Sequence, residues 1–150
     1  MSGGKAGALY SLAHRKANAL NALRAMAEEL VSCLNENQED EGLDNALSIL
    51  EARGKKLKEI ELLDQRMAFL ADSGYTPEAA EARRVAAEGE TIEALLRLVQ
   101  GLDEQASQRL YALQASLMES LKEVKDGQRS IQAYAPLPEE EEGRQVDTLR

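Results

Sequence analysis

The chain has 150 residues, a formal net charge of −9, three prolines, one cysteine, one histidine and no tryptophan. A chain of this length has room for one modest hydrophobic core. The negative charge argues against nucleic acid or an anionic membrane surface as the main partner, because both attract cationic proteins. No apolar run approaches the roughly 20 residues of a membrane-spanning helix, so we expect no membrane insertion.

The first residues, Met1 to Lys5, lack the apolar stretch of a secretory signal. A lone cysteine cannot form an intrachain disulfide, and nothing in the sequence indicates an oxidising compartment. We therefore expect a cytoplasmic protein. The prolines stand at positions 77, 136 and 138, which leaves the ranges 1–76 and 78–135 without any. Because proline removes a backbone donor and clashes with the preceding turn, these ranges favour long helices.

The first predicted helix runs from about residue 8 to residue 37. Apolar residues recur along it at spacings of three and four, which places them on one helical face. They are Leu20, Leu23, Ala27, Leu30 and Leu34. The polar range 35–42 ends on a glycine and is expected to connect this helix to the next.

The second predicted helix covers about residues 43–73. Its apolar face is expected to contain Leu43, Leu47, Leu50, Leu57, Ile60, Leu63, Met67 and Leu70. Gly54 falls on this face, where it either costs about 1 kcal/mol relative to alanine or lets a neighbouring helix approach closely. The basic run Lys55-Lys56-Leu57-Lys58 fits a solvated helix face, with a site for an acidic partner as the alternative. Gly74 favours a left-handed C-cap.

Thr76-Pro77-Glu78 is a helix-start signal. It is expected to open a short helical segment over about residues 77–88, which Gly89 interrupts. A final helix over about residues 91–134 would span on the order of 65 Å, longer than its partners, so one end should lack an intramolecular neighbour. Its apolar face is expected to contain Leu96, Val99, Ala106, Leu110, Leu113, Leu117, Leu121, Val124 and Ile131.

These elements predict an all-α fold: an elongated antiparallel bundle or coiled coil of three long helices with a short extra helical segment. Residues 1–135 are expected to form the bundle domain. Residues 136–150 include the run Glu139 to Glu142 and are expected to form an acidic disordered tail. Such a tail either solubilises the chain or docks on a basic surface.

The sequence offers few groups for catalysis. His14 is the only histidine, whereas a di-iron site in a helical bundle needs two Glu-x-x-His motifs. Cys33 is interpreted as a small residue at the edge of the core, with a reactive thiol as the alternative. Gly3-Gly4-Lys5 follows no strand and does not make a phosphate loop. We therefore expect no catalytic residue, no metal and no cofactor, and interpret the chain as a protein-binding protein and not an enzyme.

Three passages carry a resemblance to a known family. They are KKLKEIELLDQR at 55–66, IEALLRLVQGLDEQ at 92–105 and LKEVKDGQRSIQAY at 121–134. Over about residues 8–135 the chain resembles the cytosolic export chaperones of the bacterial flagellar type III system, the FlgN/FliT-like group. Where a FlgN-like pattern often shows Leu-Asn-x-x-Asn, this chain has Leu102-Asp103-Glu104-Gln105, so the branch and the cargo stay open.

The resemblance implies a function. Such chaperones hold the amphipathic C-terminal helices of hook-associated or filament-cap proteins, prevent their premature self-association and deliver them to the export apparatus. Our hypothesis places the cargo surface on the last helix, with intramolecular core as the alternative for each leucine. Its residues are Leu110, Leu113, Leu117, Leu121, Val124 and Ile131, and Tyr134 is expected to help docking. The alternative functions are a structural coiled-coil homodimer without a client and a regulator that sequesters a transcription factor.

Overall fold

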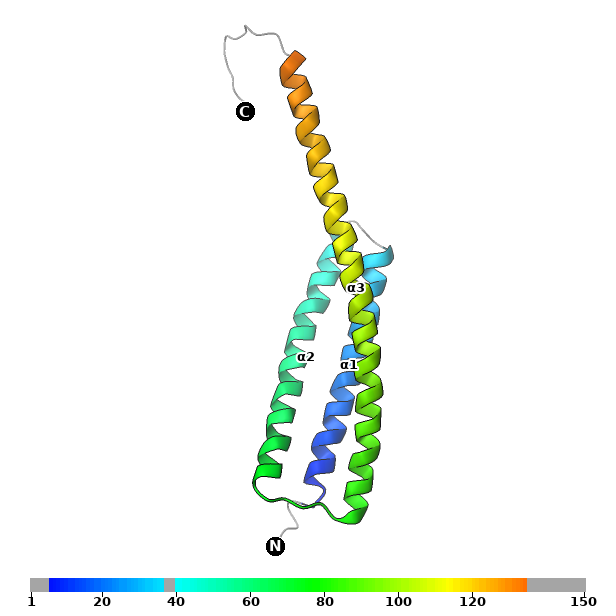
Figure 1. The fold of residues 1–150 in the computed structure, drawn as a ribbon, viewed down its shortest axis with the longest axis vertical. Helices are drawn as coiled ribbons and strands as arrows, with labels where there is room; N and C mark the ends of the chain where they lie inside the picture. The colour runs from blue at the N-terminus through cyan, green and yellow to red at the C-terminus, as the bar shows by residue number, and fades with distance from the viewer. Residues whose placement is uncertain (1–5, 37–39, 135–150) are drawn as a thin grey trace. The chain divides into compact units, whose positions relative to one another are not determined.

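The computed structural model describes residues 6–36 and 40–134, without the side chains of 36, 40, 41 and 130–134. In these ranges the chain forms three helices, α1 (Ala8–Glu36), α2 (Asp40–Asp72) and α3 (Ala79–Tyr134), and no strand (Figure 1). The prediction of an all-α helical bundle is confirmed. The chain divides into two compact units, the first ending at Leu110 and the second beginning at Tyr111. None of the helices, as far as they are described, is apolar enough over a sufficient length to span a bilayer.

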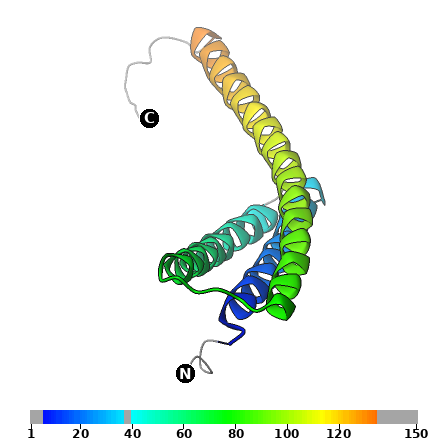
Figure 2. The ribbon, with the colours of Figure 1, turned by 60° about the horizontal axis from the view of Figure 1, so that its bottom comes forward.

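The core of the first unit is built around α1, which lies between α2 and the first part of α3 (Figures 1 and 2). Leu20 and Leu23 of α1 and Leu63 of α2 are almost completely buried. Ile60 of α2 and Leu95 and Val99 of α3 join the same cluster. The predicted face of the first helix is confirmed, because its five members are all buried. These are Leu20, Leu23, Ala27, Leu30 and Leu34.

The face that α2 buries differs from the predicted one in its first half. Ala46 and Ile49 are buried, whereas the predicted leucines from Leu43 to Leu57 are exposed. The sequence of α2 contains two apolar stripes that are offset by one residue. The predicted face follows one stripe as far as Leu57 and the other stripe from Ile60 onward. Burial follows a single stripe at spacings of three and four, because only residues in one such register stay on one side of a straight helix. The buried or half-buried members are Ala46, Ile49, Arg53, Lys56, Ile60, Leu63, Met67 and Leu70.

The prediction of a short extra helical segment before the last helix is wrong, because α3 continues without a break through Gly89. A glycine inside a helix costs about 1 kcal/mol relative to alanine. Packing on both sides of it offsets this cost: Val85 and Ile92 are half-buried and Leu95 is buried. The helix begins at Ala79, after the predicted start signal, with the amide of Ala82 donating to the carbonyl of Glu78 at 2.8 Å.

Two other sequence predictions have different outcomes. The predicted connection over residues 35–42 is too long, since α1 ends at Glu36 and α2 already begins at Asp40. Polar residues without proline are compatible with a helix, so polarity alone did not mark its ends. The predicted tail, residues 136–150, and the predicted domain boundary at residue 135 lie outside the described residues.

Gly74 ends α2 in the manner that the sequence predicted. Its φ of 87° lies in the left-handed region. Its amide donates to the carbonyl of Ala71 at 3.1 Å, and the amide of Tyr75 donates to the carbonyl of Leu70 at 3.3 Å. This pair of bonds is a Schellman motif, which satisfies carbonyls at the end of a helix.

Two glycines give a matched test of the backbone. Gly89→Ala should raise the free energy of unfolding by about 0.5–1 kcal/mol, because Gly89 is helical and an added Cβ meets nothing within 4 Å. Gly74→Ala should lower it by about 1 kcal/mol or more, because alanine is strained at a φ of 87°. Urea unfolding followed by circular dichroism measures both. A loss of stability in Gly89→Ala would show that α3 is interrupted there.

Candidate functional site

The second unit carries an exposed apolar face on α3, which we call the α3 face. Five large apolar side chains on it are between 56% and 73% exposed, and Leu113 beside them is half-buried. The α3 face consists of Tyr111, Leu113, Leu117, Met118, Leu121 and Val124. A run of 14 helical residues rises about 20 Å, so the α3 face is long enough to lie against several turns of another helix.

The helical repeat explains why these residues form one face. Leu117 and Val124 are seven residues apart, as are Tyr111 and Met118. Residues seven apart lie within about 20° of each other around a helix axis. Leu121 lies between the two stripes, so the α3 face is wider than a simple coiled-coil seam.

Four of the predicted cargo-binding residues lie on the α3 face of the second unit. Leu113, Leu117, Leu121 and Val124 lie on the α3 face, whereas Leu110 is the last residue of the first unit and is 40% exposed. The side chains of Ile131 and Tyr134 lie outside the described residues. The predicted involvement of all these residues in binding stays a prediction.

Sequence reasoning missed Tyr111 and Met118, which are 73% and 63% exposed. They lie beside the seam of three- and four-residue spacings and not on it. The signal that could have found them is their own seven-residue spacing together with their exposure, since large apolar side chains grouped on a surface mark interaction sites.

Basic side chains border one edge of the α3 face. Lys122 and Lys125 line a hollow of about 290 Å³ together with Met118 and Leu121. Both lysines are exposed, and neither makes an ion pair with a described residue. Lysine stems can cover apolar surface while their charges stay in water, so this edge combines apolar contact with positive charge.

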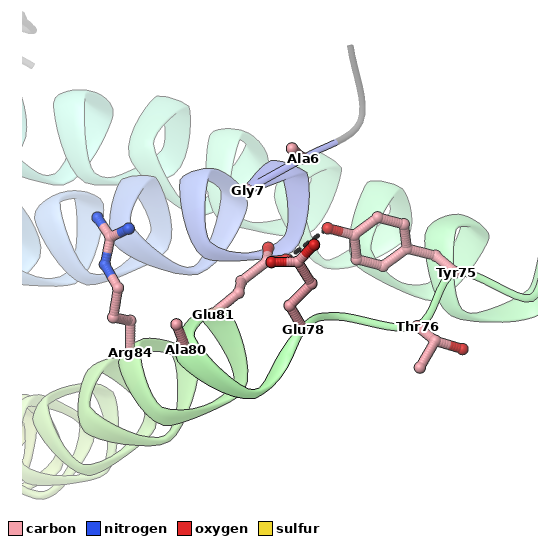
Figure 3. A pocket seen from close by; sticks show the side chains of 8 residues that line it. All are labelled: Ala6, Gly7, Tyr75, Thr76, Glu78, Ala80, Glu81 and Arg84. Atoms are coloured by element: carbon pink, nitrogen blue, oxygen red, sulfur yellow. Dashed lines mark hydrogen bonds between the residues drawn. The ribbon is translucent and has the colours of Figure 1, made fainter. Parts of the chain in front are cut away.

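A second cluster lies in the first unit, where α1 and α3 both begin (Figure 3). Glu81 is the one buried charged residue among those described, at 8% exposure. One carboxylate oxygen accepts the amide of Tyr10 at 2.9 Å, and the other accepts the hydroxyl of Tyr75 at 2.5 Å. Because the first amides of a helix have no partner within the helix, Glu81 acts as an N-cap for α1 that is supplied by α3.

Neighbouring side chains reinforce this connection between α1 and α3. The guanidinium of Arg84 lies over the ring of Tyr10, 3.9 Å from its centroid. His14 stacks on Tyr10 with 5.5 Å between ring centroids, and its Nδ1 is 2.9 Å from Oε2 of Glu88. These contacts tie two turns of each helix together.

The hydrogen bonds around Glu81 change two pKa values. The hydroxyl of Tyr75 lowers the pKa of Glu81 below 4.5 by donating to the charged form, and the amides of Tyr10, Leu9 and Gly7 lower it further against the opposing effect of burial. The same bond raises the pKa of Tyr75 above 10.0, since the neighbouring carboxylate disfavours a phenolate.

This cluster has a structural role. It borders a cavity of about 450 Å³, lined mainly by Gly7, Tyr75, Glu78, Glu81 and Arg84. Each oxygen of Glu81 accepts one hydrogen bond, from Tyr10 on α1 and from Tyr75 after α2. Among the described residues no three His, Cys, Asp or Glu side chains are grouped as metal ligands.

The helix α2 exposes a further set of apolar residues, including Leu47 at 64% and Phe69 at 74%. Near its first half, Arg53 donates two hydrogen bonds to the carboxylate of Asp103 on α3, at 2.9 and 2.7 Å. This bidentate pair joins α2 to α3 within the first unit. Exposed charges of both signs lie along the same helix, including Glu51, Lys58 and Glu61. On α3, Lys122 and Lys125 instead line one hollow with Met118 and Leu121, so we take the α3 face as the candidate binding site.

Comparison with protein-family models, curated proteins and solved structures finds no match for this chain.

Removing the charge of Glu81 tests its role as an N-cap. Glu81→Gln should lower the free energy of unfolding at pH 7 by about 1 kcal/mol, because hydrogen bonds to a charged acceptor contribute more than those to a neutral amide oxygen. Because the folded pKa of Glu81 is lowered, its contribution is complete above 4.5 and disappears as the pH falls through the folded pKa. Urea unfolding from pH 3 to pH 7 measures the difference, with Glu78→Gln as the exposed control. An equal loss for both variants would contradict the N-cap.

Proposed function

We propose that the chain is a chaperone that binds an amphipathic helix of another protein along the α3 face. The observation that carries this proposal is the exposure of five large apolar side chains on one side of the second unit. Exposed apolar surface of this kind is costly in water, and a helix-in-groove or helix-on-helix partner removes it from water.

The size of the α3 face suits reversible binding. Burying a large apolar side chain contributes roughly 1–2 kcal/mol when it is already partly covered. Five such side chains contribute roughly 5–10 kcal/mol before the cost of association, which is itself several kcal/mol. This balance supports a complex that forms and dissociates, as delivery of a bound protein requires.

The sequence resemblance suggests which protein is bound. We propose that the partner is the C-terminal helix of a hook-associated or filament-cap protein of the flagellum, held in the cytoplasm before export. In this role the chain prevents premature self-association of its cargo and passes it to the type III export apparatus. The role requires no catalytic residue and no cofactor.

One observation also favours a second candidate, a homodimer. The seven-residue spacing of Leu117 and Val124 is that of a coiled-coil seam, and a second copy could cover the same face. A permanent dimer would keep its mass when a cargo is added, whereas a chaperone would form a new complex. Light scattering with and without a candidate cargo distinguishes the two.

The double variant Leu117→Asp, Leu121→Asp tests the proposed surface. Both leucines are about 60% exposed, so the free energy of unfolding should change by about 0.5 kcal/mol or less. Binding of a flagellar cargo helix should weaken by about 100-fold or more, because two charges would enter the apolar contact. Fluorescence anisotropy with a labelled cargo peptide measures binding, and circular dichroism measures stability.

A control variant carries the same two charges elsewhere on α3. Ala112→Asp, Ser116→Asp places them on exposed positions outside the α3 face and should leave cargo binding unchanged. If Leu117→Asp, Leu121→Asp unfolds the protein, these leucines belong to a core. If it folds and still binds the cargo, the α3 face is not the binding site.

A further inference from the structure

Three basic residues of the second unit lie beside the α3 face. Lys122, Lys125 and Arg129 follow one another at spacings of three and four, as residues on one side of a helix do. Lys125 lies seven residues after Met118, so it continues the outer stripe of the α3 face. We call Lys122, Lys125 and Arg129 the basic edge.

The carboxylates of the same segment lie elsewhere around α3. Glu119 and Asp126 are seven residues apart, and each directly follows a residue of the outer stripe, Met118 or Lys125. Since one residue turns a helix by about 100°, they lie farther from the α3 face than the basic edge does. Asp126, four residues after Lys122 and three before Arg129, lies next to the basic edge on its far side. The single ion pair recorded between the two sets joins Arg129 to Asp126 at 3.9 Å, which is a long contact.

The hollow beside Met118 is lined by both the basic edge and the α3 face. Its four lining residues are two from the α3 face, Met118 and Leu121, and two from the basic edge, Lys122 and Lys125. A helix that covers the α3 face would therefore also pass next to these two ammonium groups. Charges that are partly shielded from water in this way interact more strongly than fully solvated ones.

We propose that the α3 face binds a partner helix whose apolar stripe is bordered on one side by acidic residues. Their spacing should be three to four over two turns, so that they pair with Lys122, Lys125 and Arg129. This inference depends on the proposed function and adds the charge and the orientation of the bound helix. A partner helix with its acidic residues on the opposite border would place them away from the basic edge, and it would bind less tightly.

Two other occupants fit the charges less well. An anionic membrane attracts helices with basic residues along the polar side, but here the polar side also carries Glu119 and Asp126. A second copy of the chain carries its own basic edge beside its own apolar stripe, and within residues 111–129 only Glu123 comes near the other border. Residues 111–129 of a second copy therefore do not supply three carboxylates to the basic edge.

Three synthetic amphipathic peptides with the same leucine stripe test this inference on the full chain. The first has glutamates on one border at positions i, i+3 and i+7, the second has lysines there, and the third has the glutamates on its polar back. By fluorescence anisotropy the first should bind about tenfold or more tightly than the second, and more tightly than the third. Its advantage should shrink as salt is raised from 50 to 500 mM.

The variant Lys122→Glu, Lys125→Glu should reverse the preference, so that the lysine peptide binds more tightly than the first peptide. Lys55→Glu, Lys58→Glu changes the net charge equally, on exposed positions of α2, and should leave the preference unchanged. Equal binding of all three peptides would overturn the acidic border and leave helix binding intact. Binding of none would overturn the proposed function itself.

Vesicles provide the last comparison. Phosphatidylcholine vesicles with 30% phosphatidylserine should not bind the chain at 150 mM salt. Vesicle binding that disappears in Lys122→Glu, Lys125→Glu, without any preference among the peptides, would assign the basic edge to a membrane surface and overturn the proposal.

Discussion

Burial of α1 between α2 and the first part of α3 is the interaction on which the first unit depends. Leu20, Leu23 and Leu63 are almost fully covered, and small residues of α1 such as Ala13 and Ala17 are buried as well. Small side chains let neighbouring helices approach closely. Because α1 packs against one apolar stripe of each neighbouring helix, the other apolar stripe of α2 stays largely exposed. Beyond Leu110, α3 continues and carries an apolar face of its own.

The polar groups of the first unit reinforce the same packing. Glu81 accepts the amide of Tyr10 at the start of α1 and the hydroxyl of Tyr75, and Arg53 and Asp103 join α2 to α3. Hydrogen bonds to charged groups contribute more than neutral ones, so these few contacts fix where α3 runs against α1. The closely paired charged side chains of the first unit therefore hold its helices together. In the second unit, Lys122 and Lys125 make no ion pair with a described residue.

Much of the fold could be predicted from the sequence, since proline-free ranges and leucines at spacings of three and four indicate long helices. The register of α2 could not, because two apolar stripes lie one residue apart and only contact with α1 selects Ala46 and Ile49. The N-cap of α1 could not either, because Tyr10 and Glu81 are 71 residues apart. For the candidate site, the residue spacing predicts that Leu117, Leu121 and Val124 share one face of the helix. The same spacing fits a buried seam, and only the exposure of these side chains distinguishes a binding surface from a seam.

Amide hydrogen exchange on the full chain tests the central claim, that the α3 face is open in the free protein and covered by a partner helix. Without a partner, amides of residues 111–124 should exchange much faster than those around Leu20 and Leu23, because only the helix itself protects them. Adding a bound amphipathic helix should slow exchange at residues 111–124 and leave α1 unchanged. Protection at residues 111–124 as strong as in α1 without any partner, at every protein concentration, would contradict the account.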